Sequence, residues 1–250
     1  MDTSEAKKGN CICASFYLQA VLQTPCYEAS VFFYKRKHST FNLRVHETGT
    51  DQGCCYIWHE GVAILGSNEI RSCLLIFLND SCKDKDVIFY SDICVGQNKN
   101  KYVASMYLYA VKKLEIKSIA HKFLEVGHTQ NAWGMMRVLI EQQKQTQLKS
   151  GTIFVPSQWG VALNFVKNVD IENVVSNDIK LMRVSKDKPY TIQYKTIYDD
   201  EKTVSPFSKI NITYTQLPPI TDSKKKDLLS LCEANLITKH YYHFYKNFNS

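Results

Sequence analysis

The chain has 250 residues, of which 44% are hydrophobic and 12% aromatic, and its formal net charge at pH 7 is +7. A chain this apolar buries enough surface to offset its ordering entropy, which excludes intrinsic disorder. The longest aliphatic or aromatic run, 74–78, is far shorter than the ~20 residues of a membrane helix. The polar first ten residues lack the apolar core of a secretory signal. We therefore expect a globular intracellular protein, nuclear or cytoplasmic, with no membrane partner.

The basic charge suits a polyanionic partner such as nucleic acid, although many proteins of similar charge bind none. The nine cysteines are odd in number and scattered through apolar stretches. This usage is typical of reduced, buried thiols rather than of a disulfide framework. No CxxC pair occurs, so the pattern does not favour a structural zinc site.

The first part of the chain alternates short strands with turns. Residues 11–22 predict a buried strand, 41–46 alternate apolar and polar side chains, and 54–59 follow a glycine-bounded turn. This order predicts an antiparallel meander. Apolar residues at helical spacing then follow Gly66, and they predict a helix with Ser67 as its N-cap.

Two strand–helix units come next. Residues 87–91 are a short apolar run, and 103–114 carry an apolar stripe on one side of a helix. Residues 118–126 predict another strand, and 133–148 a long helix. Strands alternating with helices in this way are typical of an α/β or α+β core around a mixed sheet.

Beyond residue 150 we expect a smaller β segment and a helical tail. Ser157 is a candidate cap for a helix that carries Trp159. The other predicted elements are a short strand at 152–155, β-like runs at 179–184, 190–198 and 208–217, and helices at 227–234 and 238–248.

The predicted fold is therefore α/β: a mixed sheet flanked by helices, with a small β-rich extension and a C-terminal helical pair. We divide the chain into a core at 11–156, an extension packed on it at 157–219, and C-terminal helices at 220–250.

Asp92 is the first candidate for chemistry. It follows a buried strand, and open α/β sheets bind ligands at the carboxyl ends of their strands. The alternative is a turn-forming aspartate that caps the loop after it.

Four segments around Asp92 and elsewhere carry a resemblance to a known family. They are WHEGVAILGSNEIRSCL (58–74), FYSDICVGQNKNKYV (89–103), GHT (127–129) and KKKDLLSLCEANLITKHYYHFY (224–245). In this order the chain resembles, from about residue 14 to 248, transposon-derived proteins common in insects and other invertebrates. Their motifs run close to SFDLQ, YSDNCxGQNKN and GHTxMExDxxHxxIE. The resemblance implies an RNase H-like transposase core: three antiparallel strands, a helix, and a strand that carries the second acid.

Such cores use three carboxylates to hold two Mg2+ ions. The second acid matches Asp92, but Tyr17 replaces the first, Gly134 stands at the family's Asp, and Arg137 stands at its His. Glu141 lies seven residues beyond Gly134, roughly 10 Å further along a helix, too far to share a metal pair spanning about 4 Å. The resemblance thus implies an inactive relative, a pseudoenzyme without a cofactor and with at most weak metal binding at Asp92.

An active Mg2+-dependent nuclease remains the alternative, with Asp92 paired to Glu60, Glu69 or Glu141. The structural interpretation of Glu60 and Glu69 is a strand-end acid and a helix first-turn acid stabilised by the macrodipole.

Nucleic-acid contact would survive the loss of catalysis. Lys99, Asn100 and Lys101 follow Asp92 at the rim where such cores hold the DNA backbone, with His128 and Arg137 as further candidates. The alternative is a polar loop that opens a helix. The tyrosine-rich tail either stacks on unpaired bases or packs a terminal helix onto the body. We predict residual non-specific DNA binding, with a protein-interaction scaffold, which would be an oligomer, as the second alternative.

Overall fold

The structure is a computed structural model that describes residues 6, 9, 11–27, 30–94, 96–124, 142, 145–146, 148–149, 151–162, 181–187, 192–195, 202–204 and 217–249. Within these residues the strands form one sheet, in the order β2-β3-β1-β5-β6-β7-β8-β9, with β4 on the other side of β3. The strands are β1 (Cys11–Leu18), β2 (Leu22–Thr24), β3 (His38–Glu47), β4 (Gln52–His59), β5 (Asp86–Ser91), β6 (Ser118–Phe123), β7 (Leu181–Ser185), β8 (Ile192–Lys195) and β9 (Lys202–Val204).

The helices are α2 (Ser67–Ser81), α3 (Lys101–Lys113), α5 (Pro156–Ala162), α6 (Asp222–Glu233) and α7 (Tyr242–Lys246), with 3-10 turns η1 (Ser30–Phe32) and η2 (Lys239–Tyr241). No helix in the described part of the chain is long and apolar enough to cross a bilayer. None of the nine cysteines, all of which lie within the described residues, forms a disulfide bond.

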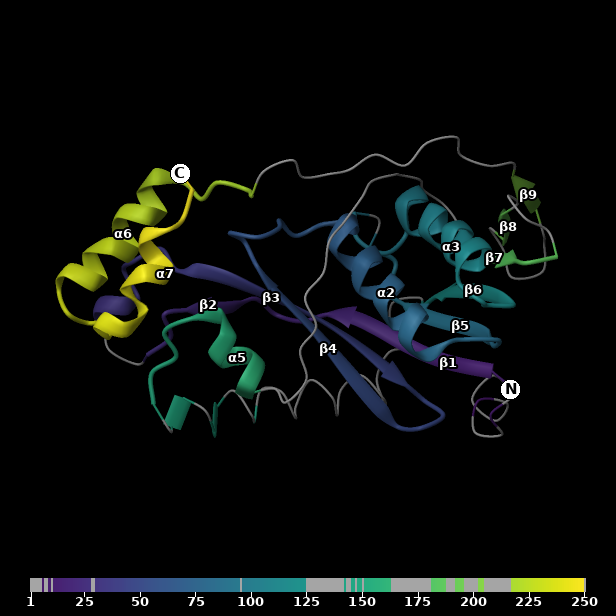
Figure 1. The fold of residues 1–250 in the computed structure, drawn as a ribbon, viewed down its shortest axis with the longest axis horizontal. Coiled ribbons are helices and arrows are strands. Elements are labelled where there is room, and N and C mark those ends of the chain that lie inside the picture. Colours follow the sequence, from purple (N-terminus) through teal and green to yellow (C-terminus); the bar gives the residue numbers. More distant parts are fainter. Residues whose placement is uncertain are drawn as a thin grey trace.

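The sheet combines two pairing modes. Strands β4, β3 and β1 are antiparallel neighbours, whereas β1, β5 and β6 run parallel. Helix α2 connects β4 to β5, and α3 connects β5 to β6 (Figure 1). Three antiparallel strands, a helix and a further strand is the order that the resemblance implied. The predicted α/β class, with its mixed sheet and C-terminal helical pair, is confirmed.

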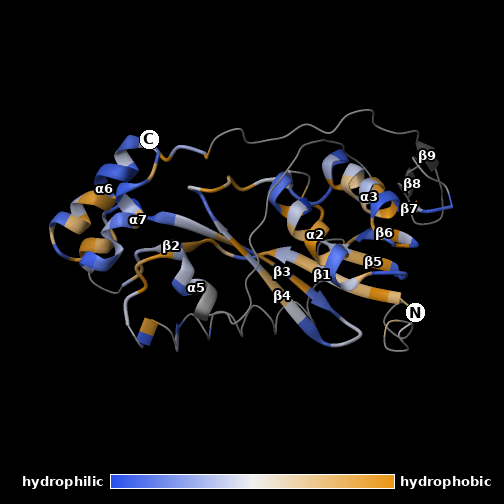
Figure 2. Cartoon of the chain, in the orientation of Figure 1, coloured by the Kyte–Doolittle hydropathy of each residue, from blue (hydrophilic) through white to orange (hydrophobic). Residues whose placement is uncertain are grey.

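The main core lies between the sheet and the helices α2 and α3, which cover one face of it (Figure 1). Phe16 of β1 meets Phe89 of β5 edge-on, with ring centroids 5.6 Å apart, and Phe89 stacks on Tyr107 of α3. Ile70 and Leu74, from the stripe that predicted α2, are fully buried here. Hydropathy follows this arrangement, because hydrophobic residues concentrate in the central strands and in both helices (Figure 2).

Three local predictions are wrong. Ser67 is the first residue of α2 rather than its cap, because Gly66 occupies the N-cap position without a side-chain hydrogen bond. Ser157 lies inside α5, which begins at Pro156. The strand predicted at 152–155 is only an isolated bridge, since the side chain of Gln158 accepts hydrogen bonds from two backbone N–H groups that a strand would need.

The smaller β segment continues the core sheet. Strand β7 pairs antiparallel with β6, and β8 and β9 follow it. The runs at 179–184 and 190–198 thus correspond to β7 and β8, whereas the run at 208–217 and most of the helix at 133–148 lie outside the described residues. The domain boundaries proposed from the sequence stay a prediction.

The C-terminal helices form a second core at one end of the molecule (Figure 1). Helix α6 is followed by Asn235 in the left-handed conformation, with φ +55°. The N–H of Asn235 donates to Cys232 and that of Leu236 to Leu231, which is the Schellman pattern of a helix end. The chain can then turn back, so that Tyr245 of α7 packs with Leu228 of α6.

Candidate functional site at the carboxyl end of β5

Asp92 is the exposed residue directly after β5, where the parallel strands end. A buried polar chain fixes its backbone. The Ser91 hydroxyl lies 2.9 Å from the Asp92 carbonyl and 2.9 Å from His121 Nε2, and the Tyr107 hydroxyl lies 3.2 Å from His121 Nδ1. If Tyr107 donates to Nδ1, Nε2–H donates to Ser91 and Ser91 donates to the carbonyl, every group is satisfied. The strand end is therefore rigidly placed.

His121 lies in the middle of this hydrogen-bonded chain, and its side chain is not accessible to a substrate in solvent. It is fully buried beside the rings of Phe16, Phe89 and Phe123. Burial lowers the pKa of His121 to about 3, because the charged form loses its hydration. The imidazole is therefore neutral at pH 7, and its role is to hold the hydrogen bonds with Ser91 and Tyr107.

The carboxylate of Asp92 organises its own loop. Its Oδ1 accepts hydrogen bonds from the backbone N–H of Cys94 at 3.1 Å and from Asn98 Nδ2 at 2.5 Å. The N–H groups of Asn98 and Lys99 donate to the Cys94 carbonyl and complete the turn. These contacts are those of the turn-forming aspartate that the sequence left as an alternative.

Tyr17 lies where the first acid of the resembled family would stand. The parallel register of β1 and β5 ends at Ser15↔Tyr90, and continuing it by two residues brings Tyr17 level with Asp92, which follows the end of β5. Both are on the face away from α2 and α3, because side chains alternate along a strand. Burial raises the pKa of Tyr17, so that the phenol is protonated at pH 7.

Arg44 flanks Tyr17 on its other side. It is the direct cross-strand partner of Tyr17 in β3, and its guanidinium packs over Gly53 of β4. A Cβ at Gly53 would stand 2.6 Å from Arg44 Nη2, so a side chain there would displace the guanidinium from its present place. Burial raises the pKa of Tyr17, and the hydrogen bond from Gln19 and then the positive charge of Arg44 partly offset this effect.

These residues do not fit a pair of Mg2+ ions. Mg2+ requires carboxylate and water oxygens in octahedral geometry, whereas Tyr17 offers a neutral phenol and Arg44 adds a positive charge. One carboxylate oxygen of Asp92 already accepts two hydrogen bonds from its own loop. Among the described residues no three His, Cys, Asp or Glu side chains gather in a group that could hold a metal ion.

Glu60 does not lie beside Asp92. Both of its carboxylate oxygens are 2.7 Å from Lys224 Nζ of α6, and Oε1 also accepts from the Ser39 N–H at 2.7 Å. Ser39 is five residues along β3 from Arg44, about 17 Å at 3.4 Å per residue. Glu60 therefore ties the C-terminal helices to the sheet, and its predicted metal role with Asp92 loses its geometric basis.

Glu69 is a buried residue of helix α2. It lies in the first turn of α2 and is 1% exposed, on the helix-covered side of the sheet. Its charge contributes, after burial, to raising the pKa of Cys73 one turn later. The remaining predicted residues Glu141, His128, Arg137 and Gly134 lie outside the described part of the chain.

The three predicted phosphate contacts open helix α3. The side-chain oxygen of Asn100 accepts from the N–H groups of Tyr102 and Val103, which makes Asn100 the N-cap. Lys99 is 8% exposed, with its Nζ 5.7 Å from the centroid of the Phe123 ring. Lys101, in the first turn, is half-buried. Asn100 thus takes the structural role that the sequence offered as an alternative.

Other basic residues, which the sequence did not single out, share the face of Asp92. Lys122 of β6 pairs with Tyr90 and lies over its ring at 5.6 Å, and Arg183 of β7 is exposed beside Ala120. With Arg44 they place three cations on one side of the sheet. The alternation of side chains along each strand shows which of its residues share a face. Which strands are neighbours, and therefore which cations lie together, is known only from the strand order.

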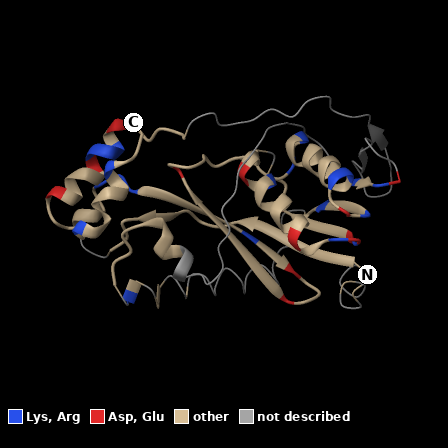
Figure 3. Ribbon diagram, viewed as in Figure 1, with Lys and Arg blue, Asp and Glu red and all other residues tan. Residues whose placement is uncertain are grey.

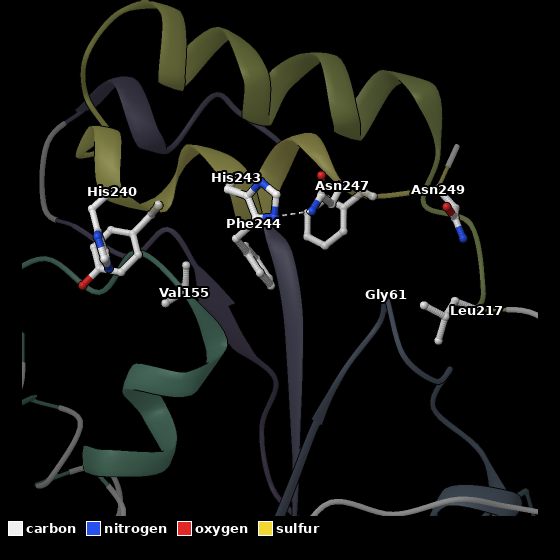
Figure 4. A pocket seen from close by; sticks show the side chains of 10 residues that line it. Gly61, Val155, Leu217, His240, His243, Phe244, Asn247 and Asn249 are labelled. Carbon is white, nitrogen blue, oxygen red and sulfur yellow. Dashed lines mark hydrogen bonds between the residues drawn. The ribbon is translucent and has the colours of Figure 1, made fainter.

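A second candidate site is a cavity of about 430 Å³ beside α7 (Figure 4). Asn247 Nδ2 lies 2.8 Å from His243 Nε2 at its edge. The lining residues are Gly61, Val155, Leu217, His240, Tyr241, His243, Phe244, Asn247, Phe248 and Asn249. This lining combines aromatic, amide and imidazole side chains and holds no carboxylate.

The aromatic tail beside this cavity is largely packed. Tyr245 is fully buried and its hydroxyl donates to the Phe154 carbonyl, while Tyr241 stacks on the Phe154 ring at 5.4 Å. Phe248 stacks on His38 at 4.4 Å. These contacts are those of the packing alternative for the tail.

A family model described as a domain of unknown function (DUF7869) matches residues 36–142, which include the strands β3 to β6 and Asp92. The matched segment is less than half of the chain, and its description assigns no activity. Neither the curated proteins nor the solved structures contain a match to the chain.

Proposed function

We propose that the chain is a transposon-derived, RNase H-like domain that binds DNA non-specifically without cleaving it. The order of the sheet supports this origin, because three antiparallel strands lead through α2 to the strand before Asp92. The motif around Asp92 supports it further.

The observation that carries the loss of catalysis is the identity of the residue opposite Asp92. Where a second carboxylate would share the metal ions, Tyr17 is a protonated phenol whose cross-strand neighbour is Arg44. A cation beside the site opposes the binding of two further cations. Phosphodiester hydrolysis by a metal pair thus lacks its ligands among the described residues.

The three cations on the face of Asp92 support DNA binding. Arg44, Lys122 and Arg183 lie on successive parts of the same sheet face. Contacts of basic side chains to phosphates position a protein on DNA, carry little sequence information and weaken with salt. The free thiols fit a reducing compartment, the nucleus or the cytoplasm.

The alternative of an active nuclease requires another acid at Asp92. Glu60 is bound to Lys224, and Glu69 is buried in the first turn of α2. No described contact favours this alternative.

Fluorescence anisotropy with a labelled blunt duplex tests DNA binding. The logarithm of the binding constant is expected to fall linearly with the logarithm of salt concentration, and a Lys122→Ala/Arg183→Ala variant is expected to lower the slope by roughly 0.9 per lost contact. Lys113→Ala, an exposed lysine on α3, is the matched control and leaves the slope unchanged. Absence of salt-sensitive binding would contradict the proposal and favour a protein-interaction scaffold.

A further inference from the structure

Two consecutive aromatic side chains stand in solvent directly after η1. Phe33 is 73% exposed and Tyr34 is 88% exposed, the highest values among the large hydrophobic side chains of the described residues. The preceding Phe32 is 2% exposed and packs in the C-terminal core with Leu228 and Tyr245. The backbone is therefore anchored while both rings remain outside, and exposed aromatic surface of this kind marks an interaction site.

Three basic residues continue the same segment. Arg36 is fixed on α6, because its backbone N–H donates to Asp227 Oδ2 at 3.2 Å and its Nη1 at 2.8 Å. Lys35 Nζ lies 3.7 Å from the same carboxylate, and Lys37 Nζ lies 5.6 Å from the centroid of the Phe33 ring. The Asp227 carboxylate pairs with Lys35 and Arg36 but not with Lys37, so the segment keeps a positive excess beside its exposed rings. Basic residues of α6 lie at the same end of the molecule (Figure 3).

We propose that residues 33–37, the aromatic–basic loop, bind single-stranded nucleic acid. Unpaired bases expose faces that stack on aromatic rings, and the backbone phosphates of the same strand seek cations. The Lys37 ammonium lies over one face of the Phe33 ring, and the rest of this exposed ring and the Tyr34 ring are open to a base, so a base and its phosphate can meet a ring and a cation together. A duplex hides its base faces in the stack and gains only the charge contacts.

This site is separate from the face of Asp92. Lys37 precedes β3, and Arg44 lies seven residues further along that strand, about 24 Å at 3.4 Å per residue. The loop is carried by η1 and α6, neither of which contributes to the surroundings of Asp92. Its role does not depend on the function proposed for that face.

Anisotropy titrations with labelled oligo(dT), oligo(U) and the blunt duplex test the proposal on the full chain. A Phe33→Ala/Tyr34→Ala variant is expected to bind both single strands at least about tenfold more weakly, since each stacked base contributes substantially to affinity. Duplex binding by this variant is expected to stay unchanged. Tyr109→Ala, which removes a ring 42% exposed on α3, is the matched control and keeps full single-strand affinity.

A second variant reports the stacking itself. Tyr34→Trp keeps a stacking ring, so its affinity for oligo(dT) is expected to match that of the parent chain, with fluorescence quenching beyond that of the parent. Unchanged single-strand affinity in the Phe33→Ala/Tyr34→Ala variant overturns the proposal. So does binding of the loop to anionic vesicles without binding to either oligonucleotide. If the parent chain binds the single strands but not the duplex, that result contradicts the function proposed for the face of Asp92 and leaves the proposal for the loop standing.

Discussion

At Asp92, a residue whose position suggests catalysis makes its contacts within its own loop. Asn98 is 2% exposed, and its Nδ2 uses Asp92 Oδ1 as acceptor. Asp92→Ala is therefore expected to lower the free energy of unfolding by about 1–2 kcal/mol, the usual cost of an unpaired buried donor. Urea unfolding measures this change. Asp92→Asn retains an acceptor and should cost less; equal stability of all three proteins would refute the structural role.

Two buried histidines predict acid sensitivity. The pKa of His121 is lowered to about 3 by burial, and that of His38 to about 3 by burial and then by the neighbouring His59 and Lys224. Above pH 6.5 both are neutral in the folded and the unfolded chain, so neither affects the pH dependence. As pH falls from 6.5 towards 3, only the unfolded chain takes up these protons, so the folded state loses stability.

The expected loss is about 1.4 kcal/mol per pH unit for each histidine once the unfolded chain is fully protonated. Urea unfolding at successive pH values measures it. His121→Gln keeps polar partners for Ser91 and Tyr107 but cannot titrate. The free energy of unfolding of this variant should therefore fall less steeply with decreasing pH, by the contribution of one histidine. A variant with the parent slope would show that His121 is charged in the folded protein.

Among the elements, α3 depends on its cap. Asn100 accepts from two N–H groups in the first turn, whereas Thr221 at the N-cap of α6 makes no side-chain cap hydrogen bond. Asn100→Ala is expected to cost about 1 kcal/mol of stability, with Asn100→Asp near neutral. Thr221→Ala is the control and should cost less. If instead DNA affinity falls in Asn100→Ala while thermal unfolding is unchanged, Asn100 is a contact residue.

The attachment of α6 to the sheet gives a prediction of its own. Glu60 and Lys224 form a two-pronged ion pair, and each side chain is about one-fifth exposed. A double-mutant cycle with Glu60→Gln and Lys224→Met should yield a coupling of about 1 kcal/mol. Zero coupling would mean that this ion pair does not help to hold α6 on the sheet. Lys226→Met, an exposed lysine one residue before Asp227, serves as the uncoupled control.

The periodic elements could be predicted from sequence because burial imposes their period. Helices α2 and α3 follow stripes at helical spacing, and β5 and β6 follow short apolar runs. Local signals failed where a competing contact decided the outcome. Gln158 took the N–H groups of a predicted strand, and Gly66 rather than Ser67 occupied the cap.

The candidate site was only half accessible to sequence reasoning. The place of Asp92 after a strand follows from the apolar run before it, and Tyr17 at the first acid's position follows from the resemblance. Arg44, Lys122 and Arg183 could not be found, because a cationic face depends on strand order and register. Both are properties of the assembled sheet and not of any one strand.

At the scale of the whole molecule, two surfaces of different chemistry lie on one chain. The sheet face around Asp92 carries cations suited to phosphate contacts. The aromatic–basic loop carries exposed aromatic rings as well as cations. Glu60 and Lys224 join helix α6 to the sheet. We propose that the chain binds nucleic acid and does not cleave it, since among the described residues no group of metal-ligating side chains surrounds Asp92.

Metal-dependent nicking of supercoiled DNA is the most direct measurement of that claim. The purified chain is incubated with Mg2+ or with Mn2+, beside Asp92→Asn as control. The expected result is binding without cleavage, with the parent chain and the variant indistinguishable. Nicking by the parent chain that requires the metal and disappears in Asp92→Asn would contradict the account.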